Sequence, residues 1–213
     1  LRIRLRFGVA FMVVRGVYGR LPTLPATPGF EGGGVVDQAG PGLLRVIRGL
    51  RPGRRVAVLN SVGGNWAEKV VVPARQLVPV PDDVPDEQVA SFFVNPATAI
   101  VMTQFVLKIG QGDWLLQTAA GSALGRMIIR LARHAGFRTI NTVRRREQVE
   151  EIKKLGGDEV ICTNDEVIED RVKAITGGQG VRFAIDPVGG ATSQGVIRSL
   201  GPGARMLLYG TLS

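Results

Sequence analysis

The sequence predicts an α/β protein in which a small β domain precedes a doubly wound parallel sheet. Ten of the twelve prolines lie in the first 100 residues, where short apolar runs are separated by Gly-rich turns. This composition is typical of an irregular β domain or a small barrel. In the second half, five strand-like runs alternate with helix-like segments, which is the pattern of right-handed βαβ units.

Composition excludes several classes of protein. The 213 residues are 45% hydrophobic and 21% charged, an ordinary globular balance. No stretch approaches the roughly 20 uncharged apolar residues that a membrane-spanning helix requires. The only cysteine, Cys162, cannot form an internal disulfide, and with the single histidine, His134, a Cys₄ or Cys/His zinc cluster is impossible. We therefore expect neither a membrane segment nor a structural zinc.

The charge is strongly basic, with 27 Lys and Arg against 18 Asp and Glu and a net charge of +9. Arginines gather in acid-free blocks at Arg2–Arg20, Arg45–Arg55 and Arg126–Arg146, which are able to meet an anionic partner. No aromatic-plus-basic RNA-binding motif accompanies them, so a nucleic acid is not the expected partner. The chain begins inside a strand-like run and stops directly after another, so we expect a fragment truncated at both ends.

The first half is expected to form short strands joined by turns. Apolar runs bounded by Gly and Pro predict strands at Leu1–Phe7, Val35–Val36, Arg55–Leu59 and Lys69–Val72. The segment Pro79–Asp83 has the composition of a linker. A helix is expected after it, because Asp86 and Glu87 suit the positive end of a helix dipole.

The second half is expected to alternate strands and helices. The predicted strands are Trp114–Gln117, Thr139–Val143, Val160–Cys162, Phe183–Ile185 and Met206–Tyr209. The predicted helices are Ala123–Ala135, Glu147–Leu155, Val167–Ile175 and Ala191–Leu200. In the first helix, Leu124, Ile128 and Ala132 recur on one face and mark its buried side. Asp186 ends a strand and is interpreted as a turn or capping residue.

The turn after the first of these strands has the composition of a phosphate-binding loop. A dinucleotide fold needs small residues there, because the backbone must approach the pyrophosphate and the next helix must point its free N–H groups at it. The G-x-G-x-x-G pattern would place glycines where this chain has Ala120, Ser122 and Gly125. Ser122 is small, and its hydroxyl is able to donate to a phosphate. The candidate cofactor contacts are Gly121, Ser122, Ala123 and Leu124.

The end of the second strand favours NADPH over NADH. An NAD site usually carries Asp or Glu about 20 residues past the glycine motif, where it holds the ribose 2′-hydroxyl. This chain has Arg144, Arg145 and Arg146 at that place, directly after Val143. A carboxylate would repel a 2′-phosphate, whereas guanidinium groups bind it. Positive charge before a helix also opposes the helix dipole, which favours an anion at this position.

The segment Gly29–Val36, G-F-E-G-G-G-V-V, resembles the signature G-H-E-x-x-G-x-V of the medium-chain dehydrogenase/reductase superfamily. Phe30 stands where the zinc alcohol dehydrogenases of that superfamily have a histidine ligand. The chain resembles the zinc-independent branch over nearly its whole length. The resemblance implies an incomplete GroES-like catalytic domain at residues 1–110 and an incomplete NADP-binding Rossmann domain at residues 111–213, without catalytic zinc.

Several segments resemble one subfamily, the 2-enoyl thioester reductases of the mitochondrial fatty-acid-synthesis type. They are Gly16–Pro22 (G-x-Y-G-x-L-P), Asn95–Ala99 (N-P-x-T-A), Ser122–Gly125 (S-G-V-G), Arg144–Arg146 (R-x-R) and Tyr209–Leu212 (Y-G-G-M). The resemblance implies a catalytic role for Tyr18. It also implies cofactor contacts for Asn95, for Arg144, Arg145 and Arg146, and for Tyr209, Gly210, Thr211 and Leu212.

These observations lead to an expected function with two alternatives. We expect NADPH-dependent reduction of a trans-2-enoyl thioester of CoA or acyl carrier protein in fatty-acid biosynthesis, with Tyr18 assisting proton delivery. The alternatives are an NADPH:quinone or alkenal oxidoreductase of the same superfamily, and a non-catalytic NADPH- or RNA-binding remnant. The expected partner is the small-molecule thioester, with a homodimer if the chain is complete. The expected location is the bacterial cytoplasm or the eukaryotic mitochondrial matrix.

Overall fold

The computed structural model describes residues 9–19 and 21–210, and the chain folds into two compact units, Leu1–Val94 and Asn95–Ser213. The strand predicted at Leu1–Phe7 lies outside the described residues. The family resemblance implies a boundary between the two domains at residue 110, and this boundary stays a prediction.

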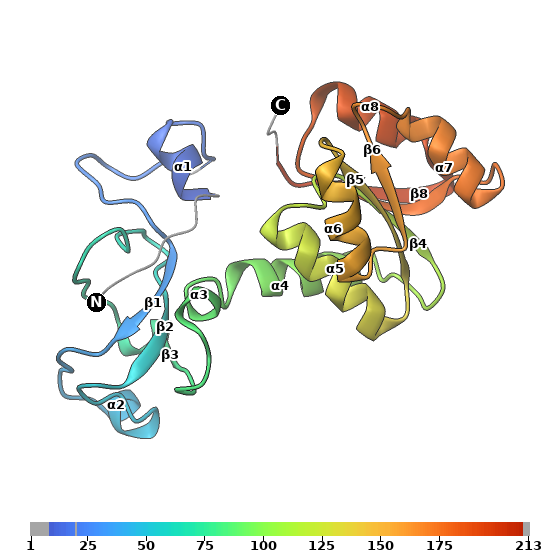
Figure 1. Cartoon of the computed structure of the whole chain (residues 1–213). Helices are drawn as coiled ribbons and strands as arrows, with labels where there is room; N and C mark the ends of the chain where they lie inside the picture. Colours follow the sequence, from blue (N-terminus) through green and yellow to red (C-terminus); the bar gives the residue numbers. More distant parts are fainter. Residues whose placement is uncertain (1–8, 20, 211–213) are drawn as a thin grey trace. The chain divides into compact units, whose positions relative to one another are not determined.

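The first unit is built on a three-stranded antiparallel sheet in the order β1-β2-β3 (Figure 1). Its strands are β1 (Glu31–Val35), β2 (Arg55–Leu59) and β3 (Leu77–Pro79). Its helices are α1 (Val9–Val14), α2 (Leu43–Ile47), a 3-10 turn (Ala74–Gln76) and α3 (Asp86–Val89). Two small clusters of buried aliphatic side chains, around Val58 and Val80, form the core. The predicted irregular β domain is confirmed.

Strand β1 carries three consecutive glycines, and one of them is required by packing. An ideal Cβ atom at Gly33 would lie 2.7 Å from Cγ1 of Val89, so helix α3 comes too close to the strand for a side chain there. The strand predicted at Val35–Val36 begins earlier than predicted, at Glu31. Strand propensity does not reveal a strand made largely of glycine.

Two predictions for the first unit are wrong. The segment Lys69–Val72 is a loop and not a strand. An apolar run becomes a strand only where a neighbouring strand completes its backbone hydrogen bonds. In the described part of this unit, the segment that pairs with β2 on the side away from β1 is β3 and not Lys69–Val72. Pro79–Asp83 is not a linker either, because Pro79 ends β3 and the next residue, Val80, is 1% exposed in the core.

The second unit is a five-stranded sheet in the order β6-β5-β4-β7-β8, with every neighbouring pair parallel. The strands are β4 (Trp114–Gln117), β5 (Arg138–Val143), β6 (Glu159–Cys162), β7 (Val181–Asp186) and β8 (Leu200–Leu208). The helices are α4 (Val94–Ile100), a π-helix (Val101–Val106), α5 (Ala123–Ala135), α6 (Glu147–Leu155), α7 (Ile168–Thr176) and α8 (Gly190–Arg198). The predicted parallel topology is confirmed. Across residues 9–19 and 21–210, every helix is too short or too polar to cross a bilayer.

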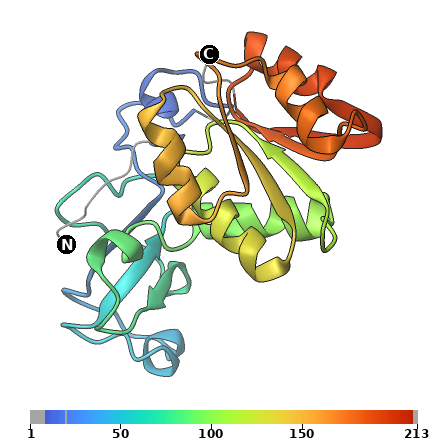
Figure 2. The ribbon, with the colours of Figure 1, turned by 45° about the vertical axis from the view of Figure 1, so that its right-hand side comes forward.

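Helices cover both faces of this sheet, as a doubly wound fold requires. Leu115 of β4 packs with α5, and Val143 of β5 packs with α5 and α6. Leu116 points to the opposite face and packs with α7 and α8. Figure 1 shows these two helical layers on opposite sides of the sheet, and both remain visible in the rotated view of Figure 2. Strands buried on both faces explain the continuous apolar runs of the sequence.

The predicted helix bounds agree with the structure except at the last helix. Helices α5 and α6 have the predicted bounds, and α7 differs by one residue at each end. Helix α8 ends at Arg198, because Leu200 already belongs to β8. An ideal Cβ at Gly201 would lie 2.5 Å from the carbonyl oxygen of Gln179, so the chain passes close to another loop there.

Helix α4 is capped by a residue distant in sequence. Glu31 Oε2 accepts a hydrogen bond of 3.0 Å from the backbone N–H of Val94, the first residue of the helix. Burial raises the pKa of the Glu31 carboxyl, although hydrogen bonds from Val94 and Phe93 oppose the rise. A local sequence pattern cannot reveal such a cap. This explains why neither α4 nor the π-helix after it was predicted.

Candidate functional site

The sheet of the second unit reverses its winding direction beside β4. From β4 the chain winds through β5 to β6, and it then places β7 and β8 on the other side of β4. The carboxyl ends of strands at such a reversal leave a crevice in which doubly wound folds bind their ligands. Strand β4 ends at Gln117 and β7 ends at Asp186, so the turns after these two residues form the candidate site.

The turn after β4 presents a helix N-terminus suited to an anion. Ala119 has a φ of 50°, a left-handed conformation that costs a residue with a Cβ about 1–2 kcal/mol. Ser122 caps α5, since its Oγ accepts a hydrogen bond of 3.1 Å from the N–H of Gly125, and its hydroxyl proton stays available to donate. The first turn of α5 contains no acidic residue. The positive end of its dipole is therefore open to a phosphate.

Gly125 sets how closely α5 approaches the turn that precedes it. An ideal Cβ at this residue would lie 2.6 Å from the carbonyl oxygen of Ala120 and 2.7 Å from its Cα. The side chain of Gln117 in β4 also holds the start of α5 against the sheet. Its Nε2 donates to the Gly125 carbonyl oxygen at 3.2 Å and to Oδ1 of Asn141 in β5 at 2.7 Å. Glycine at position 125 is thus a packing requirement.

The four predicted residues of the turn differ in what they offer. Ser122 is exposed, and Gly121 and Ala123 are half-buried. The side chain of Leu124 is buried in the core beneath α5, so this residue offers a ligand only its backbone. Arg126 lies against the turn, because its Nε donates to the carbonyl oxygen of Gly121 at 3.0 Å.

The predicted arginines lie next to this turn. The N–H of Ala120 donates to the carbonyl oxygen of Thr142 at 3.0 Å, which ties the turn to the end of β5. Arg144, Arg145 and Arg146 follow that strand end directly, and all three are exposed. The structure therefore brings together the helix N-terminus and the cationic cluster that the sequence predicted separately.

The partners of these arginines are weakly held. Arg145 Nε lies 3.3 Å from Glu147 Oε1, and Arg146 Nε lies 2.9 Å from Asp165 Oδ2. The hydrogen bond from Arg146 lowers the pKa of the Asp165 carboxyl. Because the two arginine side chains are 60% and 82% exposed, water screens both ion pairs and they contribute little to stability. Such guanidinium groups are free to exchange a surface carboxylate for a bidentate contact with phosphate.

Asp186 fastens the turn after β7 to the turn after β4. Its buried carboxylate accepts hydrogen bonds from the hydroxyls of Thr118 and Ser193 and from the N–H groups of Val188 (2.8 Å) and Gly189 (3.2 Å). Burial by itself raises the pKa of Asp186, but the four hydrogen bonds outweigh burial and lower it. The predicted turn or capping role is confirmed. The link to Thr118 was not predicted, because no local pattern joins residues on different strands.

The segment after β8 lies at the same edge of the sheet. The N–H of Tyr209 donates to the carbonyl oxygen of Asp186 at 3.0 Å. An ideal Cβ at Gly210 would lie 2.8 Å from the carbonyl oxygen of Pro187, so only glycine fits. Burial and the nearby Asp186 charge raise the pKa of Tyr209 to about 12, which keeps its phenol protonated at neutral pH. The predicted Thr211 and Leu212 lie outside the described residues.

The two remaining predicted residues belong to different units. Asn95 is half-buried in the first turn of α4, a helix whose Ala99 shares a buried cluster with Leu124 of α5. Tyr18 belongs to the first unit, in the bend after α1, where its ring centroid lies 6.0 Å from that of Phe30. The roles of Asn95 and Tyr18 stay predictions.

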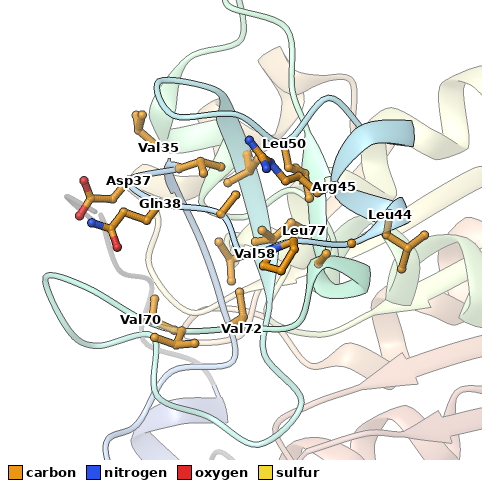
Figure 3. Close-up of a pocket in the computed structure, with 18 of the residues that line it drawn as sticks. Val35, Asp37, Gln38, Leu44, Arg45, Leu50, Val58, Val70, Val72 and Leu77 are labelled. Carbon is orange, nitrogen blue, oxygen red and sulfur yellow. The ribbon is translucent and has the colours of Figure 1, made fainter.

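The first unit also contains a cavity of about 820 Å³ (Figure 3). Aliphatic side chains such as Leu50, Val58 and Val72 line most of it. At its edge Lys69 Nζ and Asp37 Oδ2 form an exposed ion pair of 2.7 Å, which lowers the pKa of the Asp37 carboxyl. None of the predicted site residues lines this cavity. The strand ends, the helix dipole and the arginines converge instead in the second unit.

Two family descriptions match the chain. Residues 7–82 match the alcohol dehydrogenase GroES-like domain, and residues 123–213 match the zinc-binding dehydrogenase family. The chain belongs to the medium-chain dehydrogenase/reductase superfamily. Its first unit is GroES-like, and its second unit carries the Rossmann-type parallel sheet of that superfamily.

Relatives within the superfamily have two kinds of names. The mitochondrial enoyl-[acyl-carrier-protein] reductases of Rattus norvegicus and Homo sapiens are each 34% identical over 206 residues, covering 94% of this chain and 54% of theirs. The solved quinone oxidoreductases of Pseudomonas syringae and, in complex with NADPH, of Escherichia coli are 29% and 26% identical, both with a TM-score of 0.88. Each covers 98% of this chain and is itself covered to 62%. The chain thus spans about half the length of the curated relatives.

The superfamily includes zinc enzymes, so the possible metal ligands of this chain are of interest. Within residues 9–19 and 21–210, no three His, Cys, Asp or Glu side chains gather into a group able to hold a metal ion. Phe30 stands at the histidine position of the signature. Cys162 is buried, as predicted, and its thiol donates to the Arg144 carbonyl oxygen at 3.5 Å.

The contact at Gly125 predicts a stability effect. Gly125→Ala is expected to destabilise the second unit by about 2 kcal/mol or more, because the new methyl group meets backbone atoms of Ala120 that cannot rotate away. Gly195→Ala is the matched control, since a Cβ there makes ordinary contacts of 3.5 Å with Ile168 in α7. Alanine has the higher helix propensity, so the control is expected to be neutral or stabilising by up to about 1 kcal/mol. Urea denaturation followed by circular dichroism measures both, and equal stabilities would contradict the close packing.

Proposed function

We propose that this chain is part of a zinc-independent oxidoreductase that uses NADPH to reduce 2-enoyl thioesters. The observation that carries the proposal is the convergence of an acid-free helix N-terminus with Arg144–Arg146, where an NAD enzyme has a carboxylate. The complex of the E. coli relative with NADPH supports the cofactor. The names of the rat and human relatives support the thioester substrate.

The residues of the second unit fit an adenine dinucleotide phosphate. Ser122 and the backbone of Gly121 would hold the pyrophosphate, and Arg144, Arg145 and Arg146 would hold the 2′-phosphate. Tyr209, Gly210 and Asn95 are proposed for the nicotinamide half, together with Thr211 and Leu212. When bound, NADPH supplies the hydride that the β-carbon of the enoyl group accepts.

Tyr18 is proposed as the donor that completes the reaction. Enoyl thioester reduction adds a hydride to the β-carbon and a proton to the α-carbon, and negative charge develops on the thioester oxygen before the proton arrives. A hydrogen-bond donor directed at this oxygen stabilises that charge, and a phenol is able to serve at neutral pH. Tyr18 is half-buried, with its ring beside that of Phe30.

A quinone or alkenal reductase is the second candidate. The names of the two solved relatives favour it, and a quinone substrate needs no phenol donor at an α-carbon. We further propose that the thioester carrier is CoA or an acyl carrier protein and that the complete protein is a homodimer. The names of its relatives place them in the mitochondrion. For this protein we propose the mitochondrial matrix in a eukaryote and the cytoplasm in a bacterium.

The two candidates predict different substrates. The complete protein is expected to oxidise NADPH, followed by absorbance at 340 nm, when crotonyl-CoA is added and to do so far more slowly with a simple quinone. Saturated thioester should form in equal amount to the NADPH consumed. Turnover of the quinone alone would support the second candidate and reject the first.

The arginine cluster predicts cofactor discrimination. The double change Arg144→Ala and Arg146→Ala is expected to weaken NADPH binding by about tenfold or more, because each hydrogen bond to a charged phosphate contributes roughly 1.5–3 kcal/mol. NADH affinity should stay unchanged. Arg130→Ala with Arg182→Ala, two exposed arginines elsewhere in the same unit, is the control that removes the same charge. An equal loss for both cofactors in the first variant would show that the cluster does not read the 2′-phosphate.

The proposed role of Tyr18 predicts a rate effect without a binding effect. In the complete enzyme, Tyr18→Phe should keep NADPH affinity, since the predicted nucleotide site lies in the second unit. It should lower kcat and kcat/KM together by about 10²–10⁴-fold, because the developing charge on the thioester oxygen loses its donor. Steady-state kinetics with crotonyl-CoA measures this, and an unchanged rate removes Tyr18 from the mechanism.

A further inference from the structure

Gln148 lies between the phosphate-binding turn after β4 and the arginine cluster after β5. It is the second residue of α6, and it is half-buried. Its Oε1 accepts a hydrogen bond of 3.3 Å from the backbone N–H of Arg145, while its own N–H donates to the Arg145 carbonyl oxygen at 3.0 Å. The side chain is therefore attached to the arginine cluster by its oxygen end.

The other end of the same amide lies over the phosphate-binding turn. An ideal Cβ at Gly121 would lie 2.6 Å from Nε2 of Gln148 and 3.6 Å from its Cδ. The NH₂ group thus occupies the space that a side chain at Gly121 would take. Among the described residues, no acceptor pairs with the hydrogens of this NH₂ group. Since the Arg145 N–H requires an oxygen opposite it, the orientation of the amide is determined and the donor end faces the turn.

We propose that Gln148 is a specificity-determining residue that donates a hydrogen bond to the 2′-phosphate of the cofactor. The inference rests on the proposed NADPH site and adds a residue to it. A phosphate accepts hydrogen bonds and does not donate them when ionised, so a fixed NH₂ group between Gly121 and Arg145 matches it. A carboxylate at the same place would repel the 2′-phosphate and accept a hydrogen bond from the 2′-hydroxyl of NADH.

The charges around Gln148 agree with this assignment. Arg144, Arg145 and Arg146 precede it, and two acidic residues of α6 are paired with arginines: Glu147 with Arg145 at 3.3 Å and Glu151 with Arg126 at 2.7 Å. Glu147 offsets part of the charge of Arg145, and Asp165 offsets part of the charge of Arg146. Because both ion pairs are exposed and weak, an anion is able to replace these carboxylates. An anion between the turn and the cluster would meet the guanidinium groups and the amide donors together.

Two variants of Gln148 separate donation from charge. Gln148→Glu keeps an acceptor for the Arg145 N–H, replaces the donors by a negative charge, and suits the first turn of a helix, so the fold is retained. Gln148→Leu removes the polar atoms at similar volume. Gln179→Glu is the matched control, because Gln179 is an exposed glutamine at the amino end of β7, on the opposite edge of the parallel sheet.

Isothermal titration calorimetry of NADPH and NADH with the chain and its variants tests the proposal. Gln148→Glu is expected to raise the Kd of NADPH by about tenfold or more and to leave the Kd of NADH unchanged or lower. Gln148→Leu should raise the Kd of NADPH by roughly threefold to tenfold and leave NADH unaffected. The control should change neither.

The outcomes distinguish this inference from the function on which it rests. A wild-type chain without preference for NADPH would overturn both. A wild-type preference for NADPH that persists unchanged in Gln148→Glu, or an equal loss of both cofactors in that variant, would overturn the role of Gln148 and leave the proposed cofactor standing.

Discussion

The close approach of α5 to the turn after β4, at Gly125, is the constraint on which the rest of the site depends. No Cβ fits there, because it would lie 2.6 Å from the carbonyl oxygen of Ala120. This approach places the N-terminus of α5 at the carboxyl edge of the sheet and leaves Ser122 to cap it. The buried amide of Gln117 fixes the arrangement from the sheet side through its hydrogen bond to the Gly125 carbonyl oxygen.

Two further contacts complete the edge around that turn. The N–H of Ala120 binds the end of β5 and so brings the arginines beside the helix dipole. The buried carboxylate of Asp186 binds Thr118 on one side, and its backbone carbonyl accepts from Tyr209 on the other. The ends of four strands, β4, β5, β7 and β8, are thus joined at one edge of the sheet. Hydrogen bonds hold the turn for which the pyrophosphate is proposed, whereas Arg145 and Arg146, proposed for the 2′-phosphate, are exposed.

The sequence predicted the second unit well because its signals are local. Apolar runs, helix periodicity and the arginines after Val143 each depend on neighbouring residues, and they predicted the sheet, helices α5 to α8 and most of the candidate site. The first unit was harder, since three of the five residues of β1 are glycine and the segment Lys69–Val72 has strand-forming residues but is a loop. The cap by Glu31 and the Gln148 amide over Gly121 join residues far apart in sequence. No pattern within one segment encodes such contacts.

The central claim is that the crevice at the end of β4 recognises a 2′-phosphate on an adenosine. Calorimetric titration of the chain with adenosine 2′,5′-bisphosphate and with adenosine 5′-monophosphate tests it most directly, because the two ligands differ by that single group. The account predicts that the bisphosphate binds at least about tenfold more tightly, the difference that one charge-assisted contact supplies. Equal affinities for the two ligands would contradict it.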